Sequence, residues 1–444
     1  MERSRGFYLA LSATVMPLLF VVLANGCTKA GDSPSPSTSN AAGNPARVTG
    51  GAIGAPGIAP TYETRDGISV AQFDSSAFTR TNLLAIDTTP IAVLGALDTN
   101  PDFDLKHVEL ALLLSDNTVV GHSRMATKLI VFDSAGRPLR VLSRFGTVPG
   151  DVGRLQTVTR AAHDTLVIAD FSNRQANRYS ADKFVRMTPI GTVVDERADQ
   201  LAGVLRDGSL VLHNAGLMPD HFGNGRTRVD ATLMLIDVRG LSGIIAQVPD
   251  AIVVNMRSNW GGKTGPMPLP LRLGPQAQIV VWDSLIATGN GEAYRIDLRN
   301  DGGQVVSALE VAATPRAVST TIRDADLATR LAEFEEWGGT ASMGKESLRL
   351  RKAWPVADSI ATFGGFFVTP KNTLWVTDVF VPGEKMWHAT AFSSKHEMIG
   401  RLTYTGGGTP IGFGDDRVVI RTMGKDQVVT LSVYRIVHAT APAR

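Results

Sequence analysis

The sequence predicts an all-β fold, a six-bladed β-propeller with four-stranded antiparallel blades, and three observations lead to it. Short runs rich in Val, Ile, Leu, Phe and Thr recur over residues 80–438. Turns with Gly, Asp, Asn or Ser separate these runs, as in hairpins of short antiparallel strands. The pattern repeats with a period of about 45 residues, which suits four strands per unit. One such sheet cannot bury both faces alone, so we expect the units to stack in a ring.

The clearest repeat lies in residues 129–190. A Gly/Pro linker divides this stretch into two sets of strand-like runs. The runs before the linker are LIVFD and RPLRVLSRFG, and the runs after it are QTVTRAA, TLVIAD, ANRYS and FVRMTPI. The second strand of successive blades begins at Thr118, Thr165 and Ser209. The six blades are expected at 107–146, 156–190, 200–248, 277–312, 359–404 and 409–437.

The sixth blade is short of one strand. An N-terminal run such as residues 91–97 can supply that strand, which closes the ring and leaves no open edge. Residues 255–275 interrupt the start of the fourth blade and are too rich in Gly and Pro for a strand ladder. The third blade contains a long loop at residues 215–228.

One helical insertion is expected at residues 324–337, over one face of the propeller. Leu327, Leu331 and Phe334 would share one helical face. The expected N-cap is Asp324 or Asp326, and the expected end is the pair Gly338–Gly339.

Residues 1–27 predict an export signal. Arg3 and Arg5 come before an apolar run that ends in Leu-Ala-Asn-Gly-Cys. An uncleaved anchor is the alternative, because the run of about 18 residues is borderline for a membrane span. Cys27, the only cysteine, follows Gly26, and this segment resembles the lipobox of bacterial lipoproteins, which implies lipid attachment at Cys27. Ala24 departs from the usual leucine, so an ordinary signal peptidase site and a soluble periplasmic or secreted protein stay open.

Residues 28–60 are rich in Ser, Pro, Gly, Ala and Asn and are expected to be a flexible tether. A coil of about 33 residues reaches on the order of 30 Å. The predicted propeller then spans 61–438, with a tail at 439–444. We expect the protein in the bacterial cell envelope, with the lipid anchor as its only membrane contact. The net charge of +2, with both signs interspersed, argues against a nucleic-acid partner.

The order of the blade motifs resembles NHL-type six-bladed β-propellers of exported bacterial proteins. The motifs that carry the resemblance are residues 129–150, 164–180, 285–303 and 372–394, and the resemblance covers most of residues 80–438. It implies a fold and export, and it implies no reaction.

Local motifs for catalysis are missing from the sequence. GxSxG, HExxH and the calcium-loop pattern do not occur, so no catalytic or metal residue is assigned and no cofactor is predicted. Distant carboxylates can still meet on a propeller axis, so an axial calcium ion stays open. Asp170 and Asn173 are interpreted as residues that fix a hairpin loop, and Asp378, similarly placed, as structural. His213 is interpreted as a strand residue with a hydrogen-bonded ring.

The candidate binding residues are Arg257, Asn259, Trp260, Lys263, Arg272 and Trp354. Arg and Trp on irregular loops carried by a rigid ring are typical of recognition sites, although these side chains can also serve only to pack the loops. The sequence therefore predicts a module that binds a protein or a small molecule. The alternatives are a propeller hydrolase or lyase with an axial metal ion, and a scaffold subunit of an envelope complex.

Overall fold

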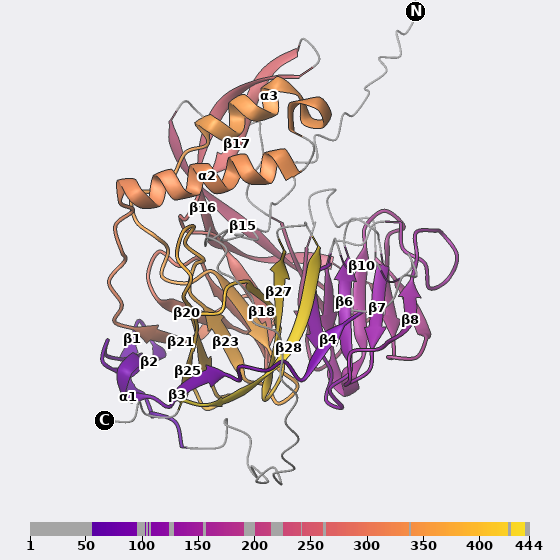
Figure 1. The fold of residues 1–444 in the computed structure, drawn as a ribbon. Coiled ribbons are helices and arrows are strands. Elements are labelled where there is room, and N and C mark those ends of the chain that lie inside the picture. The colour runs from indigo at the N-terminus through magenta and orange to yellow at the C-terminus, as the bar shows by residue number, and fades with distance from the viewer. Residues whose placement is uncertain are drawn as a thin grey trace, which may run out of the picture.

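The computed structural model describes residues 56–95, 103, 105, 108–123, 128–153, 157–190, 200–214, 225–240, 242–260, 263–336, 339–424 and 428–439 (Figure 1). The predicted export signal, Cys27 and residues 28–55 lie outside these residues. Among the helices of the described part of the chain, none has the length and apolar character needed to cross a membrane.

The body of the protein consists of antiparallel sheets whose strands follow one another along the chain, which confirms the all-β class and the four-stranded sheets. The first unit is β5 (Val108–Leu113), β6 (Val119–Ser123), β7 (Lys128–Phe132) and β8 (Pro138–Ser143). The second is β9 (Val158–Arg160), β10 (Leu166–Asp170), β11 (Gln175–Tyr179) and β12 (Phe184–Pro189), with the 3-10 turn η2 (Ala162–Asp164) after β9.

The next three units have the same strand order. The third is β13 (Gln200–Val204), β14 (Leu210–His213), β15 (Arg226–Ile236) and β16 (Ser242–Trp260). The fourth is β18 (Gln278–Trp282), β19 (Leu285–Gly289), β20 (Arg295–Arg299) and β21 (Val305–Val311). The fifth is β22 (Gly365–Val368), β23 (Leu374–Thr377), β24 (Trp387–Phe392) and β25 (Met398–Tyr404).

The last unit takes its fourth strand from the N-terminal part of the chain, as expected. Its own strands are β26 (Thr409–Phe413), β27 (Arg417–Met423) and β28 (Val429–His438). β4 (Ala92–Leu94) pairs with β28 in antiparallel register, Leu94 opposite Leu431. β3 (Leu83–Ile86) lies between β25 and β28 and joins the last two units into one sheet. The N-terminal segment therefore ties the end of the chain to its beginning.

An N-terminal hairpin, at residues where no strand was predicted, extends the fourth unit. β1 (Thr61–Arg65) and β2 (Ile68–Phe73) pair with each other, and β2 runs parallel to β21. The one-turn helix α1 (Ala77–Arg80) follows. Every residue of β1 is exposed, so β1 lacks the apolar alternation that marks the other strands.

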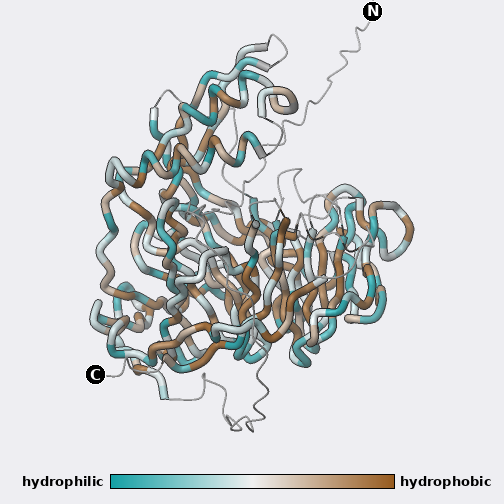
Figure 2. The backbone as a smooth tube through the Cα atoms, viewed as in Figure 1, coloured by the Kyte–Doolittle hydropathy of each residue, from teal (hydrophilic) through white to brown (hydrophobic). Residues whose placement is uncertain are grey.

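The hydrophobic core is divided into clusters, and six of those found in the described residues each join two units. Val167 and Ala169 of the second unit, for example, pack with Leu210 and Leu212 of the third. A further cluster joins the last unit to the first, where Ile411 lies with the residues of β5. The first strands of neighbouring units contact each other along the same order: β9 with β13, β13 with β18, β18 with β22, β22 with β26, and β26 with β5. Figure 2 shows the apolar residues concentrated in the body of the molecule, where the sheets lie.

The interpretation of residues 255–275 as non-ladder structure was wrong. β16 continues to Trp260 and pairs residue by residue with β17 (Lys263–Pro270). β17 is the edge strand of its sheet, and its prolines occupy alternate positions. The backbone N–H of the neighbouring Leu271 donates to the Ile252 carbonyl oxygen at 2.9 Å. Because backbone nitrogens point to alternate sides along a strand, the proline nitrogens lie on the outer side of β17, where no hydrogen-bond partner is needed.

The expected single helical insertion is a pair of helices, α2 (Thr320–Glu336) and α3 (Gly339–Ala353). α2 begins before both proposed caps, and the hydroxyl of Ser319 accepts a hydrogen bond from the Ile322 N–H at 3.3 Å. Its most deeply buried residues are Asp326, Arg330 and Phe334, whereas the expected apolar face included Leu327 and Leu331, which are only partly buried. A polar buried face carries no signal in a search for apolar periodicity.

Candidate functional site

A cap stands above one face of the body (Figure 1). We define the cap as the paired part of β16 and β17, residues 253–270, together with α2 and α3. The two helices pack on each other, and α3 contacts β16. The predicted binding residues lie in the cap or directly after it, so the structure brings together segments that are far apart in the sequence.

Two of the predicted residues present exposed side chains on a fixed backbone. Arg257 and Asn259 are exposed on β16. The Asn259 N–H donates to Glu346 Oε1 of α3 at 2.7 Å, and the Arg257 carbonyl accepts a hydrogen bond from Arg349. The hydrogen bonds from Arg349 and then from Asn259 lower the pKa of Glu346 to about 2, so this carboxylate stays ionised at neutral pH.

The other predicted residues hold the cap or lie at its tip. Arg272 is 3% exposed, and its Nε donates to Asp326 Oδ1 at 2.6 Å. Trp354 Nε1 donates to the last carbonyl of β17 at 2.8 Å, and the Arg272 guanidinium lies 5.8 Å from the Trp354 ring centre. Trp260 and Lys263 pair through their backbones at the hairpin tip, and their side chains lie outside the described part.

A network of buried charges anchors α2 and α3. Asp326 is fully buried and also pairs with Arg330 Nε at 3.0 Å. Arg330 donates to the carbonyl of Arg351, whose guanidinium lies 3.6 Å from Glu333. Burial lowers the pKa of Arg330 and of Arg351. An unpaired buried charge is costly, so each of these groups depends on its partners. The network therefore makes the cap a rigid part of the molecule.

The first strands of the units surround a cavity of about 430 Å³, lined by residues of β5, β9, β13, β18, β22 and β26. His213, the last residue of β14, lines it and is 8% exposed. Its Nδ1 has no hydrogen-bond partner within the described residues, so the expected strand position is confirmed but a bonded Nδ1 is not. Burial lowers the pKa of His213 to about 4, which leaves the ring neutral at pH 7.

Metal-ligand side chains do not gather in the described part of the chain. Its residues contain no group of three or more His, Cys, Asp or Glu placed to hold a metal ion.

The structural interpretation of Asp170 is confirmed. Its carboxylate is fully buried and accepts hydrogen bonds from the N–H groups of Gly153 at 2.7 Å, Ser172 at 3.1 Å and Asn173 at 3.2 Å. The Asn173 amide donates to the same carboxylate at 2.8 Å. Asp170 and Asn173 together fix the loop between β10 and β11 and also hold Gly153 of the linker that precedes β9.

Asp378, at the matching position after β23, has an environment that differs from that of Asp170. Its Oδ2 accepts a hydrogen bond from Arg401 Nη2 at 2.8 Å. Burial raises the pKa of Asp378, and the Arg401 charge opposes that rise. His388, Tyr294 and Arg401 line the same cavity, between the fourth and fifth units. No local motif connects these residues in the sequence.

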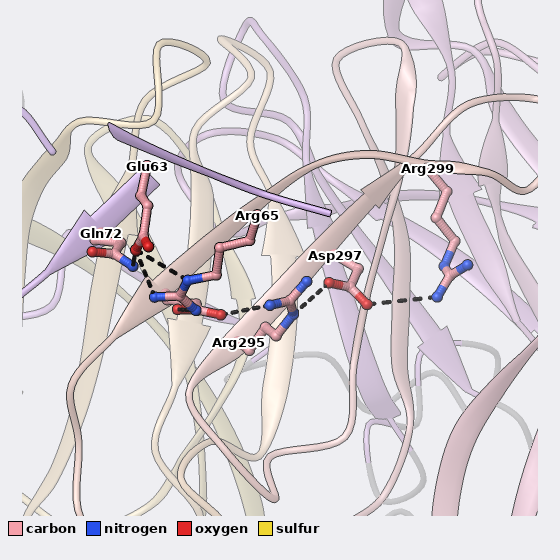
Figure 3. A network of polar contacts seen from close by, with 7 residues as sticks. Glu63, Arg65, Gln72, Arg295, Asp297 and Arg299 are labelled. Carbon is pink, nitrogen blue, oxygen red and sulfur yellow. Dashed lines mark hydrogen bonds and ion pairs between the residues drawn. The ribbon is translucent and has the colours of Figure 1, made fainter. Parts of the chain in front are cut away.

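A chain of ion pairs crosses the fourth sheet and fastens the N-terminal hairpin (Figure 3). Glu310 on β21 accepts from Arg65 on β1 at 2.8 Å and from Arg295 on β20 at 2.6 Å. Arg295 also pairs with Asp297 at 2.7 Å, and Arg299 lies 3.6 Å from Asp297. Arg65, Arg295 and Glu310 line a groove of about 770 Å³. Partly exposed pairs of this kind contribute about 0–1 kcal/mol each, so they align the hairpin more than they stabilise it.

Comparison with known proteins gives likenesses to solved structures alone. No family model matches the chain, and no curated protein matches it. An exported protein of Bacteroides fragilis is 13% identical, with 84% of this chain and 100% of that chain covered and a TM-score of 0.44. A DUF4221 family member from Bacteroides vulgatus is 9% identical, with 81% and 100% covered and a TM-score of 0.48. A gluconolactonase of Xanthomonas campestris is 12% identical, with 89% and 100% covered and a TM-score of 0.39. At these identities and scores the likenesses carry no conclusion about what this chain does.

Proposed function

We propose that this chain is an exported β-propeller that binds a partner protein through its cap. The proposal has three parts: a ring of six blades, attachment to the cell envelope through Cys27, and recognition by the exposed side of α3 and β16. Each part has its own support in the sequence or in the described residues.

The six-bladed ring is supported by packing between successive units. Each unit shares a hydrophobic cluster with the next, and one cluster joins the last unit to the first. The first strands surround a central cavity, as the inner strands of a propeller do. β4 supplies the outer strand of the last blade and closes the ring. An NHL-type propeller is the family that the blade motifs resemble.

The envelope location is supported by residues 1–27, which read as an export signal that ends in the sole cysteine. A lipid on Cys27 and the predicted tether would hold the propeller at a distance from the membrane surface. The last residues of the predicted 28–60 segment are not free, because Ile58 pairs with Met398 of β25 through two backbone hydrogen bonds of 2.9 and 3.0 Å. The cap would then be free to meet proteins of the envelope.

The observation that carries the binding function is the exposed, preorganised cap. Lys345, Arg349 and Lys352 lie three and four residues apart on one face of α3. Arg349 contacts the backbone of Arg257, so the exposed Arg257 guanidinium joins the same surface, which we call the basic face. The buried network keeps this face in place before any partner arrives, which reduces the entropy cost of binding. A partner with an acidic surface fits this charge.

The test is site-specific photo-crosslinking of the full-length chain in its own envelope. A crosslinker at Arg257 is expected to give a discrete protein adduct, and one at Leu139, exposed on β8, is the positional control. Charge reversal by Lys345→Glu with Lys352→Glu should reduce that adduct at least tenfold. Lys183→Glu with Arg186→Glu changes the net charge equally on exposed positions of the second unit and should leave the adduct intact. Equal loss in both double variants would remove the cap from the binding function.

A further inference from the structure

A second cavity, separate from the cap and from the central cavity, lies between the fourth and fifth units. Its volume is about 290 Å³. Residues after β21, the connection from β23 to β24, and the strands β24 and β25 line it, and Phe78 of α1 lies at one side. Sites for small molecules start at about 300 Å³ and combine apolar walls with a few converging polar groups.

A guanidinium group in this cavity is held from three directions. Arg401 Nη2 donates to Asp378 at 2.8 Å, and Nη1 donates to Thr390 Oγ1 at 2.7 Å. The ring centre of Phe78 lies 4.3 Å from the Arg401 Cζ. A guanidinium fixed in this way is preorganised, so little conformational entropy is lost when a ligand reaches it.

Two further polar side chains, Tyr294 and His388, line the cavity. The Tyr294 hydroxyl belongs to a residue that is 2% exposed, and it has no hydrogen-bond partner within the described residues. His388 Nδ1 lies 2.9 Å from Thr403 Oγ1. Buried polar groups are nearly always paired, so an unpaired one facing a cavity indicates a missing ligand or water.

The charges in and around the cavity cancel. Arg401 pairs with Asp378, and at the rim Arg316 pairs with Glu384 at 2.8 Å. Burial, and next the Arg401 charge, lower the pKa of His388, so that ring is neutral at pH 7. A ligand with a net charge would meet no counter-charge here and would lose its hydration, which disfavours it.

The cavity offers both donors and acceptors. Arg401 and Tyr294 donate, Asp378 accepts, and the imidazole of His388 can do either. Hydroxyl groups, which donate and accept together, match such a set better than groups of one kind. Ile360, Val379 and Val381 add an apolar wall.

We propose that this cavity binds a neutral, hydroxyl-rich molecule of the size of one monosaccharide, through Tyr294, Asp378 and Arg401. His388 contributes a further hydrogen bond. The site is independent of the cap: it uses none of the residues of the basic face, so either function can fail while the other stands.

The experiment is isothermal titration calorimetry of the full-length chain in detergent with glucose, galactose, mannose and N-acetylglucosamine. Glucuronate and glucosamine are the charged counterparts. At least one neutral sugar should bind, and glucuronate and glucosamine should both bind at least tenfold more weakly than that sugar. The proposal is overturned if no neutral sugar binds, or if glucuronate binds as tightly as glucose.

Variants separate recognition from folding. Tyr294→Phe removes only a hydroxyl that makes no hydrogen bond of standard geometry within the described residues, although Thr390 lies near enough to affect its pKa. The melting temperature should therefore change little while the affinity for the sugar falls about tenfold. Tyr404→Phe is the matched control, because Tyr404 lies on β25 outside the cavity lining. An affinity that is unchanged by Tyr294→Phe, or that falls equally with Tyr404→Phe, would contradict the assignment.

Discussion

Replacing Asp326 with Asn should destabilise the cap by about 3–5 kcal/mol, because the change leaves two buried cations without their shared carboxylate. Arg272 and Arg330 are each 3% exposed, and their Nε atoms lie 2.6 and 3.0 Å from Asp326. A pair on the surface would contribute only about 0–1 kcal/mol. The large expected value follows from burial, since neither guanidinium can recover water without opening the cap.

Amide hydrogen exchange is the suitable assay, because the cap can open while the sheets stay folded. Exchange in α2 and α3 should accelerate by two to three orders of magnitude, which corresponds to about 3–4 kcal/mol at 1.4 kcal/mol per tenfold. Asp324→Asn is the matched control on an exposed position of the same helix, and its effect should stay below about 0.5 kcal/mol.

A second variant tests the cause of the loss. Changing Asp326, Arg272 and Arg330 together to Met removes all three buried charges, so that no buried charge at these positions is left without a partner. This triple variant should recover most of the stability that Asp326→Asn loses, since apolar replacement of buried ion groups is often neutral. An Asp326→Asn effect below about 1 kcal/mol, or a triple variant as unstable as the single one, would refute the electrostatic reasoning.

Two further predictions concern the central cavity and the ring. Lowering the pH from 7 to 5 should reduce the free energy of unfolding of the wild-type chain by about 2 kcal/mol more than that of His213→Asn, because the unfolded histidine binds a proton near pH 6.5 and the buried one only near pH 4. Urea unfolding at both pH values measures this difference, and His438→Asn is the control at an exposed position. An equal loss in the wild type and in His213→Asn would contradict the prediction. Gly412→Ala places a Cβ 2.0 Å from the Ala111 carbonyl oxygen across β26 and β5, and should lower stability by about 3 kcal/mol in thermal unfolding. Gly265→Ala, where the new Cβ meets nothing within 4 Å, should change stability by less than about 0.5 kcal/mol, and equal effects would argue against a tight contact between the last and first units.

The sheets could be predicted because their information is local. The turns and the apolar runs of residues 129–190 specify strands without reference to the rest of the chain, and the period extends them to the other units. The closing strand was predictable by a different route, from the missing strand of the last repeat. β4 at Ala92–Leu94 confirms that reasoning.

The cap was the least predictable part because its stability depends on partners far apart in the sequence. Arg272, Asp326 and Arg351 look like surface charges until the fold buries them together. Among the residues of α3 whose burial is described, only Gly339, Leu350 and Arg351 are buried, so the helix has no recognisable apolar stripe. The prolines of β17 likewise disfavour a strand in general, and are accepted only because β17 is an edge.

The contrast between Asp170 and Asp378 shows how one repeat position can change its role. In the second unit Asn173 follows three residues after the aspartate, closes the loop and occupies the carboxylate. In the fifth unit Val381 stands at that position, and the connection from β23 to β24 runs from residue 378 to residue 386. The Asp378 carboxylate is therefore left to pair with Arg401 beside a cavity. Residues that recur from unit to unit maintain the fold. The fifth unit lacks the asparagine that closes the loop in the second unit, so a ligand site can arise there without weakening the neighbouring units.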